Sequence, residues 1–244
     1  MNQANKQDVP VALVTGASRR IGAAIAQQLQ KAGFRLVIHC HQSQAAAQIL
    51  ADDMNRLRAH SATVLTADLS APDAAHQLIT DSITWAGRLD LLVNNASLFT
   101  RNEADWDAMF TLNVKAPYQL SHAAFPHLVK THGSIINITD IHADKPLKGY
   151  AIYCQTKAAL SMQTKVLARE LGPNVRVNAV APGATMWPEQ GNQLNDAQQQ
   201  AIIEQTPLKR HGDPLFIAQA VLALAENAFI TGQTLRVDGG RSLN

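Results

Sequence analysis

The sequence predicts an α/β fold in which seven parallel strands form one doubly wound sheet with helices on both faces. Short runs rich in β-branched residues alternate with longer segments whose apolar residues recur at the helical spacing of three and four. Strands separated by helices pair in parallel through right-handed crossovers, and such sheets bind ligands at the carboxyl ends of their strands. The predicted strands are residues 11–15, 35–39, 62–67, 90–94, 134–139, 176–181 and 234–238.

Three segments show the clearest helical period, and one long polar insertion interrupts the alternation. The helical segments are residues 23–32, 44–57 and 151–171. The insertion covers about residues 184–205, and we expect it to form a mobile lid or substrate loop. The chain shows no repeat and no second core, so we expect a single domain over residues 1–244.

Composition excludes several classes of partner. The 244 residues are 46% hydrophobic and 16% charged, with a formal net charge of +2 and no block of like charge, so neither nucleic acid nor a membrane is expected. Cys40 and Cys154 show no metal-binding spacing, and His39, His41 and His142 show no ligand spacing either, so no metal is expected. The first residues lack the pattern of a signal peptide, which predicts a cytoplasmic protein.

The turn TGASRRIG, residues 15–22, lies between the first strand and the first helix. Thr15 and Gly16 end the strand, and Gly22 is expected to open the helix, whose free N–H groups suit a pyrophosphate. This strand–turn–helix pattern is typical of a Rossmann-type dinucleotide-binding domain. Arg20 stands where such turns commonly carry a glycine, and it either contacts phosphate and substrate together or merely neutralises phosphate.

The residues after the second strand indicate which dinucleotide is bound. A protein that binds NAD usually places a carboxylate there, on the ribose 2′-hydroxyl, whereas this sequence reads IHCHQS over residues 38–43. Donors to a 2′-phosphate are present instead on Arg19, Arg20, His41 and Ser43. NADPH is therefore the expected cofactor.

A tyrosine and a lysine share one face of a later helix. Tyr153 and Lys157 are four residues apart in YCQTK, within a strongly periodic segment. An ammonium group near a phenol favours the phenolate, so we expect Lys157 to lower the pKa of Tyr153. The pair then indicates a proton donor that works near neutral pH.

In combination, these motifs resemble the short-chain dehydrogenase/reductase family over residues 9–240. The shared landmarks are the glycine turn, Asp68 in TADL, NNAS at residues 94–97, Asn113 in LNVKAPY, the Tyr153–Lys157 pair and APG at residues 181–183. The resemblance implies that Asn113 helps to hold a water that links Lys157 to solvent. The implied cofactor-binding residues are Gly16, Ser18, Arg19, Arg20, Ile21, His41, Gln42, Ser43, Asp68, Leu69, Asn95, Ala96, Ser97, Tyr153, Lys157, Pro182, Gly183 and Ala184.

One position departs from the family pattern. The family commonly has a serine thirteen residues before the tyrosine, where its hydroxyl steadies a substrate carbonyl, but Asp140 stands there in this sequence. A carboxylate repels the oxyanion that develops on a ketone, and it suits a substrate that offers N–H donors or takes up a proton on a ring nitrogen. A pterin has these properties. Thr139 could replace the serine only if the register slipped by one residue.

Asp140, Arg20 and Phe99 together resemble the pteridine reductase branch of this family. In that branch the arginine lies by the phosphates and reaches the pterin, while the phenylalanine stacks on it; Phe99 is equally compatible with a core position. Gln42 stands where the branch often has an arginine, which bears on the strength of the 2′-phosphate preference. The implied substrate-binding residues are Arg20, Ser97, Phe99, Asp140, Tyr153, Met186 and Trp187.

The sequence thus predicts NADPH-dependent reduction of a C=N bond in a pterin or dihydropterin, giving a tetrahydropterin or tetrahydrofolate. The catalytic residues are expected to be Asp140, Tyr153, Lys157 and Asn113. Two alternatives are a short-chain reductase of a small-molecule or acyl-carrier carbonyl, and a nucleotide-sensing protein without catalysis. The tail ITGQTLRVDGGRSLN resembles the family's last strand, which commonly meets a neighbouring subunit, and this implies a homotetramer.

Overall fold

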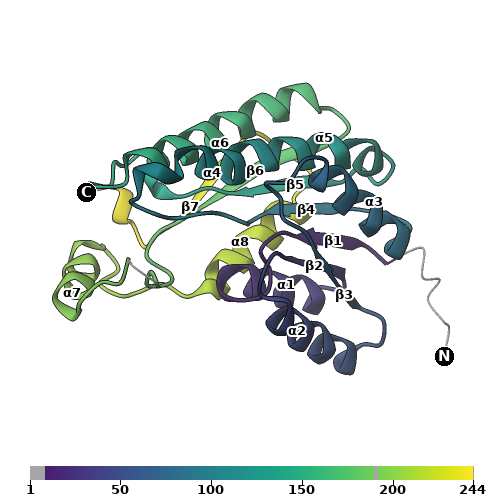
Figure 1. Cartoon of the computed structure of the whole chain (residues 1–244), viewed down its shortest axis with the longest axis horizontal. Coiled ribbons are helices and arrows are strands. Elements are labelled where there is room, and N and C mark those ends of the chain that lie inside the picture. The colour runs from purple at the N-terminus through teal and green to yellow at the C-terminus, as the bar shows by residue number, and fades with distance from the viewer. Residues whose placement is uncertain (1–8, 190–191, 244) are drawn as a thin grey trace.

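One parallel sheet organises the computed structural model, which describes residues 9–189 and 192–243. Its strand order is β3-β2-β1-β4-β5-β6-β7, and every neighbouring pair is parallel (Figure 1). Each predicted strand agrees with an observed one to within a residue at either end, so the predicted doubly wound sheet is confirmed. The strands are β1 Val11–Val14, β2 Arg35–Cys40, β3 Ala62–Thr66, β4 Leu91–Asn94, β5 Ser134–Ile138, β6 Arg176–Pro182 and β7 Thr234–Val237.

Helices cover both faces of the sheet (Figure 1). The eight α-helices are α1 Arg20–Lys31, α2 Gln44–Leu57, α3 Ala74–Ala86, α4 Trp106–Phe110, α5 Ala116–Val129, α6 Ala151–Glu170, α7 Asp196–Gln205 and α8 Pro214–Glu226 among the described residues. Ala12 and Val14 of β1 pack toward α1, α2 and α8, whereas Val11 and Leu13 pack toward α3, α5 and α6. Strands buried on both faces are apolar throughout, which is why the central runs carry no alternation of polar residues.

The predicted substrate loop is only partly a loop. Its last ten residues form α7, which stands apart from the sheet at the left of Figure 1. Asn195 accepts a hydrogen bond from the backbone N–H of Gln198, and the Gln198 side chain accepts one from the backbone N–H of Asn195. This reciprocal cap starts a helix in a segment without a strong apolar period, which explains why periodicity missed it. The predicted mobility stays a prediction, and residues 190–191 lie outside the described residues.

Two further features of the described residues bear on function. No helix among them is long and apolar enough to cross a membrane. No cluster of three or more His, Cys, Asp or Glu side chains in the same residues is arranged to hold a metal ion.

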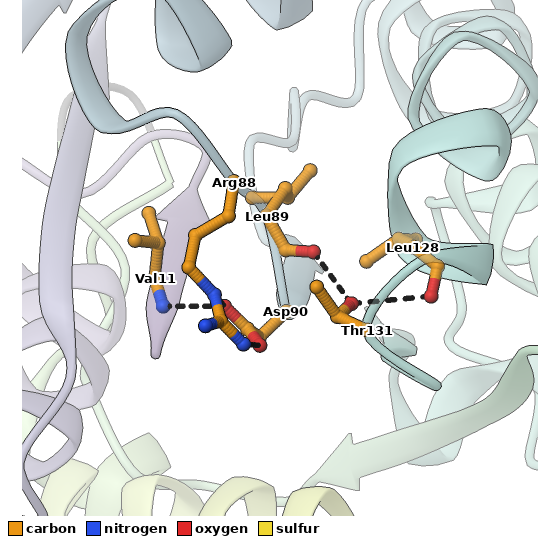
Figure 2. A network of polar contacts seen from close by, with 6 residues as sticks. All are labelled: Val11, Arg88, Leu89, Asp90, Leu128 and Thr131. Carbon is orange, nitrogen blue, oxygen red and sulfur yellow. Dashed lines mark hydrogen bonds and ion pairs between the residues drawn. The ribbon is translucent and has the colours of Figure 1, made fainter. Parts of the chain in front are cut away.

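A polar network ties the amino-terminal ends of the central strands together (Figure 2). Asp90 Oδ2 accepts from the backbone N–H of Val11 at 2.8 Å and from Arg88 Nε at 2.9 Å, and Arg88 Nη2 lies 2.5 Å from Asp90 Oδ1. The hydroxyl of Thr131 lies 2.8 Å from the carbonyl oxygen of Leu89. The network therefore joins β1 and β4 at the end of the sheet that faces away from the predicted ligand edge.

We predict that Asp90→Ala lowers the free energy of unfolding by about 2 kcal/mol, because charge-assisted hydrogen bonds to a mostly buried carboxylate are lost. The affinity for NADPH should stay unchanged, since the network lies at the opposite end of the strands. Denaturant unfolding and cofactor titration measure the two quantities. Asp52→Ala on the exposed face of α2 is the control and should change stability by less than about 0.5 kcal/mol; equal losses in the two variants would contradict the prediction.

Candidate active site

Two adjoining cavities lie at the carboxyl ends of the strands. The first has a volume of about 690 Å³ and the second about 380 Å³. Both are lined by Arg20, Ile21, Asn95 and Ser97, which therefore form the boundary between them. The first cavity is also lined by these residues from the predicted cofactor set: Gly16, Ser18, Arg19, His41, Gln42, Ser43, Asp68, Leu69 and Ala96.

The second cavity collects the predicted catalytic and substrate-binding residues. It is lined by Phe99, Asp140, Tyr153, Lys157, Pro182, Gly183, Ala184, Met186 and Trp187, together with the four boundary residues. Asn113 lines neither cavity and is buried. The structure thus brings all the other predicted site residues to one continuous region of the sheet edge.

The glycine turn has the close packing that a dinucleotide site needs. Gly16 adopts a φ of +61°, and a Cβ added to Gly22 would lie 2.4 Å from the carbonyl oxygen of Gly16. The side-chain amide of Asn95 donates to the carbonyl oxygens of Thr15 and Gly16 at 2.8 and 3.0 Å. No side chain caps the start of α1, and its first turn holds no acidic residue. These features fit a nicotinamide dinucleotide with its phosphates at the start of the helix.

The helix starts two residues earlier than predicted, at Arg20. Arg20 adopts a φ of +57°, the left-handed region that favours glycine, which explains why related turns carry a glycine here. Its guanidinium donates to the carbonyl oxygen of Trp187 at 2.9 Å and pairs with Glu189 at 2.7 Å. Arg19 lies 3.8 Å from the same carboxylate. Arg20 therefore connects the glycine turn to the segment that contains Trp187 and Glu189, and Trp187 lines the second cavity.

The His39 side chain holds the glycine turn through a hydrogen bond to the backbone of Gly16. Sequence reasoning did not assign this role to His39. Burial lowers the pKa of His39 to about 4, so the ring is neutral at physiological pH. Its Nδ1 accepts from the backbone N–H of Gly16 at 3.2 Å, and Nε2 lies 3.1 Å from the carbonyl oxygen of Ala67. The ring fixes the distance between β1 and the end of β3. The signal in the sequence is a polar residue inside a buried strand.

Three of the four catalytic candidates, Asp140, Tyr153 and Lys157, lie close together. Tyr153 donates its hydroxyl proton to Asp140 Oδ2 at 2.8 Å, and the other carboxylate oxygen accepts from the backbone N–H of His142 at 2.8 Å. Lys157 donates from Nζ to the carbonyl oxygen of Ile138 at 3.0 Å. Tyr153 and Lys157 are buried on one face of α6, as their spacing predicts.

The expected direction of the Tyr153 pKa is wrong. Burial and the neighbouring Asp140 carboxylate raise the pKa of Tyr153 well above its ordinary value. Burial lowers the pKa of Lys157 to about 8, and its Nζ lies 5.7 Å from the centre of the Tyr153 ring. In the protein without ligand, Tyr153 is therefore a protonated phenol that donates to a carboxylate.

Two neighbouring polar side chains are held by hydrogen bonds within the protein. Asn113, in the π-helical turn Thr111–Lys115, accepts from Ser97 Oγ and the Leu98 backbone and donates to the Leu98 carbonyl oxygen and Thr156 Oγ1. Its side-chain amide therefore has all its hydrogen bonds within the protein and fixes the loop after β4. The backbone carbonyl of Asn113 is a separate acceptor, so the water that links Lys157 to solvent stays a prediction. Thr139 is buried with its hydroxyl on the carbonyl oxygen of Val180 at 3.1 Å, so Asp140 is the residue that faces Tyr153.

Aromatic rings form one wall of the second cavity. Phe99 stacks on Tyr150 with centroids 4.4 Å apart and meets Tyr153 edge-on at 4.7 Å. The guanidinium of Arg101 lies 4.7 Å from the centre of the Tyr150 ring. Phe99 therefore lines the cavity and also packs in a small core cluster. Sequence reasoning missed Tyr150, which is the N-cap of α6 and lies outside the helical period that identified Tyr153 and Lys157.

Comparison with known proteins adds the family. A family model described as enoyl-(acyl carrier protein) reductase matches residues 16–242. The chain belongs to the short-chain dehydrogenase/reductase family. It is an oxidoreductase of this family, and the resemblance found in the sequence is confirmed at this level.

Two of the following three relatives carry the names of ketoacyl or oxoacyl reductases. Ketoacyl reductase 2 of the granaticin polyketide synthase from Streptomyces violaceoruber is 35% identical, with 97% of each chain covered. The 3-oxoacyl-acyl-carrier-protein reductase FabG of Staphylococcus epidermidis is 34% identical over 94% of this chain and 97% of its own. An uncharacterized oxidoreductase of Mycobacterium tuberculosis is 35% identical over 96% and 92%. The pteridine reductase branch therefore stays a prediction.

The left-handed backbone of Arg20 leads to a stability prediction. Arg20→Gly and Arg20→Ala lose the same side-chain contacts and differ only in the Cβ, which is strained at a φ of +57°. We expect Arg20→Gly to be more stable than Arg20→Ala by about 1 kcal/mol. Denaturant unfolding of the two variants measures this difference. Equal stabilities, or a more stable alanine variant, would show that residue 20 is not left-handed in solution.

Proposed function

We propose that the protein is an NADPH-dependent reductase whose substrate is a pterin or dihydropterin. The first cavity supports a phosphorylated cofactor, because the wall after β2 offers His41, Gln42 and Ser43, and Arg19 faces the same space. Asp68 is the carboxylate in this lining, and it accepts two hydrogen bonds from Ser70, which leaves it less suited to hold a ribose hydroxyl. Gln42 in place of an arginine makes the preference for NADPH over NADH modest.

The substrate class rests on one observation, the hydrogen bond between Tyr153 and Asp140. A ketone needs donors around its oxygen as negative charge develops, and here the phenol proton is directed to a carboxylate. A pterin presents N–H groups that a carboxylate accepts, and its ring nitrogen takes up a proton when the C=N bond is reduced. The aromatic wall of Phe99 and Tyr150 suits a flat heterocycle.

The chain's own residues divide the work. Bound NADPH supplies the hydride. Tyr153 donates the proton to the ring nitrogen, and Asp140 orients the phenol and accepts a hydrogen bond from the substrate. Lys157 would hold the nicotinamide ribose with the cation that it keeps below pH about 8. Phe99 and Trp187 shield the reacting face from water.

Reduction of a carbonyl on an acyl carrier is the second candidate. The names of the relatives favour it, since ketoacyl reductases match nearly the whole chain at 34–35% identity. Asp140 argues against carbonyl reduction, because its carboxylate repels the oxyanion that develops on a ketone. A sensor without catalysis has no such support, because the proton-donating pair is intact. The expected homotetramer and cytoplasmic location remain proposals that rest on the family resemblance.

Asp140→Ser separates the two candidates. We expect NADPH oxidation by a dihydropterin to fall about 10²-fold or more in this variant, because the partner of the proton donor is lost. Activity with an acetoacetyl thioester should rise, since a hydroxyl donor replaces a repelling carboxylate. Steady-state kinetics of the parent protein and of Asp140→Ser, with both substrates and with NADPH and NADH, measure these activities.

Asp144→Ser is the matched control, because Asp144 is exposed and pairs with Arg236 away from Tyr153. It should leave both activities within about twofold. If the parent protein reduces the thioester and no pterin, carbonyl reduction is the function. If Asp140→Ser reduces pterins as well as the parent does, the carboxylate has no part in the chemistry.

The lowered pKa of Lys157 predicts a pH profile. Burial disfavours the ammonium form, so the cation is present below pH about 8 and is lost above it. We expect kcat/KM for reduction to fall as pH rises through about 8. In Lys157→Arg, which keeps its charge, this limb should move to higher pH at a lower maximum rate. A limb in the same place in both proteins would assign the titration to another group.

A further inference from the structure

The second cavity contains a guanidinium that makes no hydrogen bond to any described residue. Arg241 lies in the short helical turn Arg241–Leu243 (η4) after β7, and it lines the cavity together with Asp140. Its backbone is fixed, because its carbonyl oxygen accepts from Lys145 Nζ at 3.0 Å and its N–H donates to the carbonyl oxygen of Asp238 at 3.2 Å. Its Nε is buried without a hydrogen-bond partner, and no described residue hydrogen-bonds to the rest of its guanidinium.

The other cations of this cavity considered for catalysis or binding are hydrogen-bonded within the protein or exposed to solvent. Arg20 is bound to Glu189 and Trp187, Arg101 lies over the Tyr150 ring, and Lys157 donates to Ile138. A buried donor without a partner costs free energy, and a charged one costs more than a neutral one. Among the described residues, Arg241 is therefore the guanidinium of this cavity with a buried donor that lacks a partner, whereas Arg101 is exposed to solvent.

Asp140 and Arg241 require opposite hydrogen-bonding groups of a ligand in this cavity. An ionised carboxylate only accepts hydrogen bonds, and a guanidinium only donates them. The negative charges of Asp140 and Asp238 partly offset the burial that lowers the pKa of Arg241. A ligand that satisfies both groups must offer N–H donors to one and an oxygen acceptor to the other. The pyrimidine ring of a pterin does so, with a 2-amino group and the oxygen on C4.

We propose that Arg241 is a substrate-binding residue that donates to the C4 oxygen of the pterin ring. This inference rests on the proposed function and adds the way in which the substrate is selected. A 4-oxopteridine meets the guanidinium with an acceptor, whereas a 2,4-diaminopteridine meets it with a second donor. The protein therefore discriminates between these two ring types through one side chain at its carboxyl-terminal end.

The test compares the dissociation constants of a 4-oxopteridine and a 2,4-diaminopteridine in the complex with NADP⁺. We expect Arg241→Met, which keeps the length and removes the donors, to shift their ratio about tenfold to a hundredfold toward the diamino compound. Arg241→Lys should restore part of the preference. Arg236→Met is the matched control, since Arg236 pairs with Asp144 and lines a different cavity; its ratio should equal that of the parent.

Failure of this inference can be distinguished from failure of the proposed function. Parent protein that binds neither pteridine would contradict the proposed function and this assignment with it. Parent protein that binds both, with the same ratio in Arg241→Met, would contradict the role of Arg241 alone. Equal melting temperatures and equal NADPH affinities of parent and variant show that the fold and the first cavity are intact.

Discussion

The side chain of Asn95 joins the carboxyl ends of β1 and β4, and both cavities are arranged around this joint. Its amide holds the carbonyl oxygens of Thr15 and Gly16, while Thr15 Oγ1 accepts from the backbone N–H groups of Asn95 and Ala96. These bonds bring the start of α1 against β4 so closely that a Cβ at Gly22 has no room. A dinucleotide that crosses this joint would have its phosphates in one cavity and its reactive ring in the other, because Asn95 lines both.

Much of the fold and most of the site follow from the sequence, because both depend on local patterns. Buried strands are apolar runs, and parallel strands bring their carboxyl ends to one edge, so residues that follow β1, β2, β4, β5 and β6 meet there. The contributions of Glu189 and Arg241 depend on contacts between distant segments, which no local pattern encodes. The Tyr153 pKa was predicted in the wrong direction because the sequence shows that Lys157 is near and does not show how deeply the phenol is buried.

Similarity to the relatives indicates the family and the fold, whereas the side chains of the site bear on the substrate. Identity of 34–35% across nearly the whole chain shows the family and with it the fold. A fold of this kind supports many functions, and the substrate is set by the few side chains that face it. Position 140 is such a side chain: its carboxylate is the basis of the proposed pterin substrate, while the names of the relatives favour a ketoacyl substrate.

Asp140 also fixes groups beyond Tyr153. The carboxylate oxygen that does not contact the phenol accepts from the backbone N–H of His142, the His142 ring lies 2.9 Å from the carbonyl oxygen of Lys145, and the Lys145 ammonium holds the carbonyl oxygen of Arg241. One short series of hydrogen bonds therefore runs from the Asp140 carboxylate to the backbone of Arg241, which lines the same cavity. Both residues are therefore anchored by one network, and their side chains line the same cavity, where a ligand meets an acceptor and a donor together.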